Sequence, residues 1–319
     1  MTSADEFGYL FVHHVEDPDG HGEQVFFSLS DGDDPRFWRR LNGGAPVLRP
    51  TLGTGGIRDP FLVRGDGEFF VLATDLRIYG GDDRGWDAWT RHGARSIVVW
   101  RSVDLLTWSD PWLLEVAPPE AGMAWAPEAS FDPGSGEFTL VWSSALYDPA
   151  DVEHAGDSYS RVLTARTRDF RSVEGVEVLI DRGVAVIDTT VHRFPGAVLR
   201  VSKDDSRLPG SRKLFAEVDT GDGFRVVAER IADDLYADVE APVLVHDARR
   251  DRWFLFVDQF SVRPQGYLVL TSDDPLRGGW YPLPPGEFHV PANTKHGGIL
   301  PLRAGEFERV EARFGAQRP

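Results

Sequence analysis

The chain has 319 residues, and its 51 acidic and 34 basic side chains give a formal net charge of −17. Phosphate backbones and anionic lipid surfaces repel such a charge, which excludes nucleic-acid and membrane-surface partners and leaves a neutral ligand such as a sugar compatible. The sequence contains no cysteine, so disulfides and thiolate chemistry are excluded as well. An oligomeric state does not follow from the composition.

Aromatic residues make up 12% of the chain and are accompanied by 33 Gly and 22 Pro. Many aromatic residues among frequent turn formers predict an all-β protein built from short strands. The N-terminal segment Met1-Thr2-Ser3-Ala4-Asp5-Glu6 has neither a basic nor an apolar stretch. We therefore expect a cytoplasmic protein, or a secreted one if a signal originally preceded this sequence. No run of about 18 apolar residues occurs, so no transmembrane helix is expected.

One pattern of strands recurs along the chain. A short apolar strand opened by a polar residue is followed by a Gly/Asp turn, an aromatic-rich strand, a third strand and a closing Asp. The copies open at residues 58–63, 126–129, 187–191, 240–243 and 296–300. The last copy is split, because its remaining strands lie at the start of the chain, at 9–12 and 24–28, before a predicted turn at 33–38.

Repeats of about 40–50 residues with four strands each are typical of propeller blades. We therefore predict a single domain over residues 1–319, a five-bladed β-propeller with four antiparallel strands per blade. Both termini contribute to its last blade, which closes the ring. Residues 76–95 and 147–160 are predicted loops, and the charged residues from about 303 onward a closing strand or tail. The alternative is a β-sandwich with coincidental repeats.

The inner strand of each propeller blade lines the central channel, so the residues that open these strands are expected to converge. They are Asp59, Glu128, Asp188, Glu240 and His296. Strands disfavour Asp, and clustered acids raise one another's pKa, so a function is the usual reason for such a ring. Taken alone, Asp59 before Pro can start a turn, Asp188 can cap a strand, and Glu240 can be a solvated strand end. Their shared position in the repeat favours a site.

The motifs around these residues resemble the ordered blade motifs of glycoside hydrolase family 43. They are Arg58-Asp59-Pro60, Trp125-Ala126-Pro127-Glu128, Ile187-Asp188-Thr189-Thr190, Val239-Glu240-Ala241-Pro242 and Lys295-His296-Gly297. The resemblance extends from about residue 8 to 302. It implies a five-bladed propeller that hydrolyses glycosidic bonds with inversion of configuration. The family's acid motif commonly has Gly after the Glu, where this chain has Ala241.

The resemblance implies that Asp59 is the general base, Glu240 the general acid, and Asp188 the residue that orients the acid and tunes its pKa. An inverting glycosidase needs a protonated carboxyl and an ionised one, about 6.5–9.5 Å apart. The charge of Asp188 is expected to raise the pKa of Glu240. In many members a last-blade histidine, here His296, helps to hold a structural calcium, directly or through water. The chemistry itself requires no cofactor.

Five residues are candidates for substrate contact. Two of them have a second interpretation, and the other three are chosen only because they lie at strand ends. They are Trp125, Glu128, Asp75, Lys203 and Gln259. Trp125 can stack on a sugar or belong to the core, and Glu128 is the alternative general acid. Lys203 and Gln259 end second strands, and Asp75 also follows a strand. The pair His13-His14 lacks partners at metal-ligand spacing and is interpreted as strand surface.

The expected substrate is an oligosaccharide or polysaccharide from plants or microbes that carries arabinofuranose, xylose or galactofuranose. An α-L-arabinofuranosidase is the first choice, followed by a β-xylosidase or β-galactofuranosidase and then by an endo-acting arabinanase. A non-catalytic carbohydrate-binding propeller is the alternative, and it predicts the loss of a catalytic carboxylate. A protein-interaction propeller predicts exposed apolar patches instead. The presence of all three carboxylates favours the enzyme.

Overall fold

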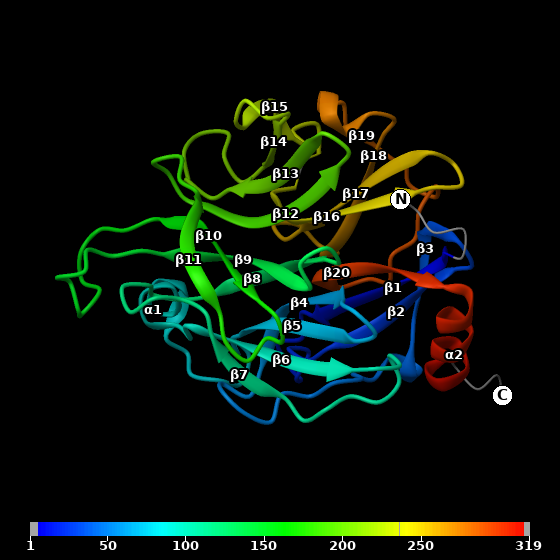
Figure 1. The fold of residues 1–319 in the computed structure, drawn as a ribbon, viewed down its shortest axis with the longest axis horizontal. Helices are drawn as coiled ribbons and strands as arrows, with labels where there is room; N and C mark the ends of the chain where they lie inside the picture. Colours follow the sequence, from blue (N-terminus) through cyan, green and yellow to red (C-terminus); the bar gives the residue numbers. More distant parts are fainter. Residues whose placement is uncertain (1–5, 236, 316–319) are drawn as a thin grey trace.

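Five four-stranded antiparallel sheets are arranged around a common centre in the computed structural model, which describes residues 6–235 and 237–315 (Figure 1). This confirms the predicted five-bladed β-propeller. Residues 1–5, which form most of the N-terminal segment from which a cytoplasmic location was predicted, lie outside the described residues. None of the helices in the described part of the chain is long and apolar enough to span a membrane.

Each blade contributes an inner, a second, a third and an outer strand. The inner strands are β4 (Ile57–Arg64), β8 (Trp125–Asp132), β12 (Val186–Phe194), β16 (Val239–Asp247) and β20 (Thr294–Arg303). The second strands are β5 (Phe69–Asp75), β9 (Glu137–Ala145), β13 (Ala197–Asp204), β17 (Arg252–Gln259) and β1 (Glu6–Val15). The third strands are β6 (Ser96–Ser102), β10 (Ser160–Thr167), β14 (Leu214–Asp219), β18 (Gly266–Ser272) and β2 (Phe26–Asp31). The outer strands are β7 (Trp112–Glu115), β11 (Glu174–Ile180), β15 (Arg225–Ile231), β19 (Tyr281–Pro282) and β3 (Asp34–Arg40).

The fifth blade joins the two ends of the chain, as expected. Its inner strand β20 pairs antiparallel with β1, with Leu10 opposite Leu300 and Val12 opposite Gly298. Figure 1 shows β20 in red beside β1 in blue. Because the C-terminal strand completes a sheet begun at the N-terminus, the fifth blade joins the two ends of the chain and closes the ring.

Apolar side chains from neighbouring sheets fill the space between the blades. Phe170 lies between the first two blades, with its ring centre 4.7 Å from that of Phe70 on β5 and 4.6 Å from that of Phe138 on β9. All three side chains are buried. Burial of each such ring contributes roughly 1.5–3 kcal/mol. Packing of this kind fixes each blade against the next and so holds the inner strands in place.

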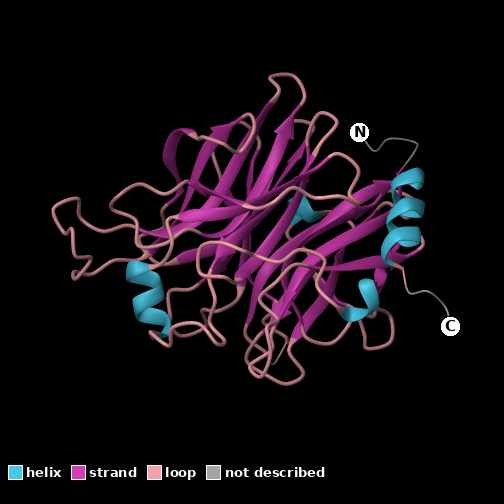
Figure 2. Cartoon of the chain, turned by 90° about the horizontal axis from the view of Figure 1, so that it is seen from below, coloured by secondary structure: helices cyan, strands magenta, loops and turns pink. Residues whose placement is uncertain are grey.

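Two helices replace structure that was predicted as loop or tail. The segment after 303 forms α2 (Ala304–Phe314), because Phe307, Val310 and Phe314 recur at helical spacing and are buried against the fifth blade. The predicted loop at 76–95 contains α1 (Gly85–His92). Figure 2 shows both helices at the rim of an otherwise β-rich molecule. Two short 3₁₀ helices, η1 (Asn42–Gly44) and η2 (Pro275–Arg277), lie in connections, and the segment 147–160 is a loop as predicted.

Two smaller predictions about the fifth blade were wrong. The turn predicted at 33–38 is mostly strand β3, which completes the sheet as its outer strand. His13 and His14 are not on the strand surface, since both are fully buried. They lie on β1, which has a strand on either side of it, and all its residues from Gly8 to His14 are buried, so both faces of this part of β1 are covered.

Candidate active site

A bulge at the same point of all five inner strands builds the site. The pairing with the second strand skips between Arg58 and Phe61, between Trp125 and Glu128, and at the corresponding points of β12, β16 and β20. In four of the bulges one residue has a positive φ, and these are Asp59 (53°), Ala126 (49°), Asp188 (50°) and Ala241 (54°). A left-handed conformation at a residue other than Gly is strained, and such strain is concentrated at functional sites.

The bulges show that the strand-opening residues, which the sequence predicted at one equivalent position, do not all occupy that position. Asp59 and Asp188 are equivalent, but Glu240 lies one residue before the bulge position, and Glu128 lies two residues after it. The sequence alone placed these residues at one equivalent point, because motif similarity does not reveal where an extra residue enters a strand. Glu128 therefore lies deeper along the channel than the three predicted catalytic acids.

Each bulge frees a backbone amide from the strand ladder, and the second strand of the preceding blade supplies a side chain near it. The contacts are Ala126 N to Thr74 Oγ1 at 2.8 Å, Asp188 N to Ser143 Oγ at 3.2 Å, and Asp59 N to His14 Nδ1 at 3.3 Å. The hydroxyl oxygens of Thr74 and Ser143 accept from the freed amides of Ala126 and Asp188, which lets the strained conformation persist in a buried region. His14 Nδ1 also lies 3.1 Å from the carbonyl oxygen of His296. The bulge residues are therefore held by their neighbours rather than by their own strand.

In the fourth blade the corresponding side chain is Lys203, which cannot accept a hydrogen bond. The freed amide of Ala241 donates to Asp188 Oδ2 instead, at 3.2 Å. This bond ties the carboxyl of Asp188 to the residue after Glu240. Asp188 is therefore placed beside the predicted acid, as its expected role requires.

Asp59 is held as an ionised carboxylate. Its Oδ2 accepts a hydrogen bond from Thr74 Oγ1 at 2.8 Å, and its Oδ1 lies 3.2 Å from His296 Nδ1. Burial favours a higher pKa, but the charge and hydrogen bond of His296 outweigh it and hold the pKa of Asp59 well below its usual range. A carboxylate that stays ionised at neutral pH has the protonation state that a general base needs.

Asp188 and Glu240 respond oppositely to their surroundings. Burial, reinforced by the charges of Glu240 and Asp59, raises the pKa of Asp188 to about 7. Burial would raise the pKa of Glu240 too, but Lys203 and Lys295 outweigh it and lower that pKa below its usual value. Lys203 Nζ lies 2.8 Å from Glu240 Oε2. The expectation that Asp188 raises the pKa of Glu240 does not hold in the free protein, because the contact with Lys203 has the larger effect.

His296 lies between two of the acids, with Nδ1 3.2 Å from Asp59 Oδ1 and 4.0 Å from Asp188 Oδ2. Burial lowers its pKa, but the charges of Asp188 and Asp59 outweigh burial and raise the pKa of His296 to about 9. A protonated imidazole has no free lone pair, and calcium prefers oxygen ligands. Within the described residues, no group of three or more His, Cys, Asp or Glu side chains is arranged to hold a metal ion. His296 as arranged does not fit direct ligation, and a calcium held through water stays a prediction.

The predicted substrate contacts lie in different surroundings. Lys203 contacts the acid itself, and Gln259 pairs with Val239 directly before that acid, although its Nε2 donates to Pro264 O at 2.8 Å. Asp75 is buried and accepts two hydrogen bonds from Thr54, each of 2.8 Å, so it anchors the loop before β4. A contact between Asp75 and substrate stays a prediction.

Trp125 lies beside an aromatic residue that the sequence did not single out. Trp86 of α1 is 52% exposed, and its ring meets that of Trp125 edge-on, with 6.0 Å between the ring centres. The guanidinium of Arg58, the residue before Asp59, lies 5.9 Å from the centre of the Trp86 ring. Trp86 and Arg58 were missed because the first lies in a segment predicted as loop and the second was taken only as part of a motif. An exposed Trp in a long insertion was the available signal.

Comparison with known families places the whole propeller in one family. Residues 5–308 match the family model described as "Probable glycosyl hydrolase domain", which is related to glycoside hydrolase family 43. The chain belongs to this family of glycoside hydrolases. An α-L-arabinofuranosidase from Bifidobacterium longum subsp. longum is 30% identical over 217 residues, which are 63% of this chain and 20% of that protein. The chain therefore spans about one fifth of the length of this curated relative.

Solved structures show weaker similarity. An α-L-arabinofuranosidase from Podospora anserina, in complex with cellotriose, is 16% identical with a TM-score of 0.48, over 75% of this chain and 71% of that one. An exo-β-1,3-galactanase from Clostridium thermocellum is 15% identical with a TM-score of 0.49, over 73% and 50%. A glycoside hydrolase family 43 protein from Bacillus licheniformis is 16% identical with a TM-score of 0.49, over 75% and 45%. At these values the similarities carry no information about the substrate of this chain.

Proposed function

We propose that the protein is an inverting glycoside hydrolase that removes arabinofuranosyl residues from glycans by general acid/base catalysis. One observation carries the proposal: the carboxyl groups of Asp59 and Asp188 lie beside the same imidazole, that of His296, and their pKa values are shifted in opposite directions. Asp59 is kept ionised by His296, whereas the pKa of Asp188, which adjoins Glu240, is raised to about 7. An inverting mechanism needs such a pair of carboxyl groups.

In the proposed reaction Asp59 takes a proton from a water molecule as the water oxygen bonds to the anomeric carbon. The bond between that carbon and the leaving oxygen breaks, and the leaving oxygen takes a proton from the acid. Each turnover therefore protonates Asp59 and deprotonates the acid, and exchange with solvent restores both. The strained backbone at Asp59 and its bond from Thr74 hold the base in one orientation.

The acid is assigned to Glu240 acting with Asp188. In the free protein Lys203 keeps Glu240 ionised, and burial gives the proton to Asp188. Coupled carboxyl groups titrate as a unit, so we treat the pair as holding one proton near neutral pH. A sugar that separates Lys203 from Glu240 raises the pKa of Glu240, and the proton then passes to the leaving oxygen through Glu240. Glu128, whose pKa burial raises to about 8, is the alternative acid.

Arabinofuranose is the first choice of sugar, because the curated relative at 30% identity is described as an α-L-arabinofuranosidase. Xylosyl and galactofuranosyl groups are the next choices. An endo-acting arabinanase and a carbohydrate-binding propeller without catalysis remain as outcomes of the test. The catalytic carboxylates are all present in the site, which supports an enzyme over a binding module.

A screen of nitrophenyl arabinofuranoside, xyloside and galactofuranoside with the wild type and three variants tests the proposal. Asp59→Asn is expected to lose about 10²–10⁴-fold in kcat/KM on every substrate. Glu240→Gln is expected to lose as much on an arabino-oligosaccharide but less on the nitrophenyl glycoside, whose leaving group needs little protonation. If Glu128→Gln shows that pattern and Glu240→Gln does not, the acid is misassigned.

The anomeric configuration of the first product, followed by proton NMR, tests inversion independently. The initial product is expected to have the configuration opposite to that of the substrate. Retention of configuration would overturn the inverting mechanism. Absence of hydrolysis on the whole panel and on natural oligosaccharides would favour the binding propeller.

A further inference from the structure

A cavity lies along the channel beyond the catalytic acids. It has a volume of about 770 Å³, and the later halves of the inner strands line it. Phe61, Thr190, Val243 and Ile299 all lie beyond the bulges on their strands and face this space. Its volume falls within the range of ligand sites in proteins. His296 and Asp188 do not line the cavity, but Glu128 does, and the charges of both act on its pKa, so the cavity adjoins the proposed catalytic site at Glu128.

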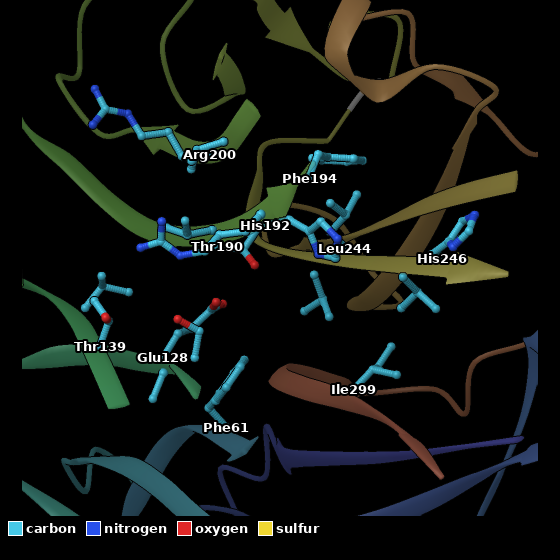
Figure 3. Close-up of a pocket in the computed structure, with 18 of the residues that line it drawn as sticks. Phe61, Glu128, Thr139, Thr190, His192, Phe194, Arg200, Leu244, His246 and Ile299 are labelled. Atoms are coloured by element: carbon cyan, nitrogen blue, oxygen red, sulfur yellow. The ribbon is translucent and has the colours of Figure 1, made fainter. Parts of the chain in front are cut away.

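Aromatic rings form one wall of the cavity. Phe194 lies 4.9 Å from Trp253 between ring centres, and His246 stacks on Trp253 at 4.3 Å with an angle of 19° between the rings. Phe194 and His246 are only partly buried, so part of each ring is available to a ligand. Figure 3 shows Phe194 and His246 on the side of the cavity opposite to Glu128 and Phe61.

Polar groups on the other wall are neutral or already paired. Glu128 is 7% exposed, and burial raises its pKa to about 8, so it is a neutral hydrogen-bonding group at pH 7. Arg200 is neutralised by Glu217, with 2.7 Å between Nε and Oε2. The hydroxyl-bearing residues Ser130, Thr139 and Thr190 complete this wall. A charged ligand would find no free counter-charge among these buried groups, and the other charged residues of the lining, Glu6, Arg193 and Asp219, are exposed or partly exposed.

We propose that this cavity is a second carbohydrate site, which binds a neutral sugar unit of the glycan beyond the catalytic acids along the channel. Aromatic faces pack against the C–H face of a sugar ring, and hydroxyl and carboxyl groups exchange hydrogen bonds with its hydroxyl groups. The choice of arabinose, xylose or galactose units rests on the proposed function. The position and chemistry of the site do not.

The test measures sugar binding by titration calorimetry on Asp59→Asn protein, in which hydrolysis is suppressed. The probes are arabinobiose, xylobiose and galactobiose. Leu244→Trp fills the cavity from β16, and Phe194→Ala removes a ring from its wall. Val178→Trp is the matched control, because it places the same large ring on the outer strand β11, where the side chain is 47% exposed and outside the cavity.

Asp59→Asn protein is expected to bind one of these disaccharides at two sites per chain. Leu244→Trp is expected to remove one site, Phe194→Ala to weaken it about tenfold, and Val178→Trp to change nothing. A single site in Asp59→Asn protein, or two sites in both cavity variants, overturns the proposal. Binding of 4-nitrophenol that Leu244→Trp abolishes, with no such loss for any sugar, overturns it in favour of an aryl ligand.

The same variants separate this proposal from the catalytic one. In Asp59→Asn protein, Leu244→Trp is expected to keep sugar binding at the catalytic site. With Asp59 intact, Leu244→Trp is expected to hydrolyse nitrophenyl glycosides, which also shows that it folds. If the wild type hydrolyses glycosides but no sugar binding is lost in the cavity variants, the second site is overturned and the proposed catalysis stands. If the cavity variants lose sugar binding but the wild type hydrolyses no substrate, the proposed catalysis is overturned and the second site stands.

Discussion

Lys203 reaches the predicted acid from the neighbouring blade. Its ammonium group lies 2.8 Å from Glu240 Oε2 and 3.2 Å from Asp205 Oδ1, and its side chain is almost completely buried. Burial lowers the pKa of Lys203, but Glu240 and Asp205 outweigh it and raise that pKa above its usual value. Lys203 is therefore charged at any pH at which the enzyme works, and it decides where the proton of the Asp188–Glu240 pair resides.

Replacing Lys203 with Met tests this control. The uncharged side chain no longer lowers the pKa of Glu240, so the pair binds its proton more tightly. Because the proposed reaction needs that proton, the alkaline limb of kcat/KM is expected to move upward by about one pH unit or more. Lys203→Arg keeps the charge and should leave the limb in place. An unchanged limb in Lys203→Met would show that Lys203 does not govern the acid.

The raised pKa of Glu128 predicts that the stability of the protein depends on pH. This pKa is raised by burial to about 8 in the folded protein, from an ordinary value of 4.5. Because the folded state binds the proton more tightly than the unfolded state, the stabilisation is complete below pH 4.5 and is lost as pH rises through about 8. In Glu128→Gln the loss of unfolding free energy between pH 6 and pH 9 is expected to be smaller by about 2–3 kcal/mol.

Denaturant unfolding at several pH values, followed by circular dichroism, measures this difference. Asp148→Asn is a suitable control, because Asp148 is exposed in the loop between β9 and β10 and its substitution should leave the pH dependence unchanged. Equal pH dependence in the wild type and Glu128→Gln would mean that Glu128 is ionised in the folded protein at neutral pH.

The α1 insertion is the element that shapes the entrance to the site. Trp89 is buried and fixes the helix to the body, whereas Trp86 is exposed next to Trp125 and Arg58. An exposed indole ring held against a second one offers a rigid apolar face to a sugar ring. The insertion between β5 and β6 therefore supplies a surface that the propeller blade alone does not contain.

Trp86→Ala is expected to raise KM for an arabino-oligosaccharide about tenfold, with a smaller change for nitrophenyl arabinofuranoside, because only the longer substrate extends to the entrance. Steady-state kinetics on both substrates measure this. Tyr281→Ala is the control, since Tyr281 is 69% exposed on the outer strand β19. Equal KM values for Trp86→Ala and the wild type would remove Trp86 from the substrate path.

At the scale of the whole molecule, the ring of blades brings the charges of five inner strands and their neighbours to one place. His296 from the last blade keeps Asp59 of the first blade ionised, and Asp188 and Glu240 come from consecutive blades. Acid, base and their partners are all protein side chains in the proposed mechanism. The state of the site therefore depends on ring closure rather than on any single blade.

Chelation tests whether a metal ion takes part in the chemistry. Treatment with EDTA is expected to leave kcat on nitrophenyl arabinofuranoside unchanged, because neither proton transfer requires a cation. Thermal unfolding of the same samples reports on a structural calcium, whose removal would lower Tm. A loss of kcat that added calcium restores would contradict the proposed mechanism.

Strand repeats along the chain were enough to predict the architecture. Alternation of apolar and polar residues, with turn formers between the strands, is a local property, and its fivefold recurrence indicated the blade count and the closure by both termini. The amphipathic spacing of Phe307, Val310 and Phe314 was also present in the sequence but was not recognised, and α1 was predicted as loop. Both helices belong to the connecting or terminal segments, where the repeat pattern gives no information.

The sequence by itself determined the fold and proposed which carboxylates open the inner strands. Only the tertiary structure decided the bulge at Asp59, Asp188 and Ala241, the burial of His13 and His14, and the contact of Lys203 with Glu240. The physical reason is the separation along the sequence of the residues that determine each property. Periodicity reports on neighbours along a strand, whereas a pKa depends on charges a few ångströms away that come from other blades.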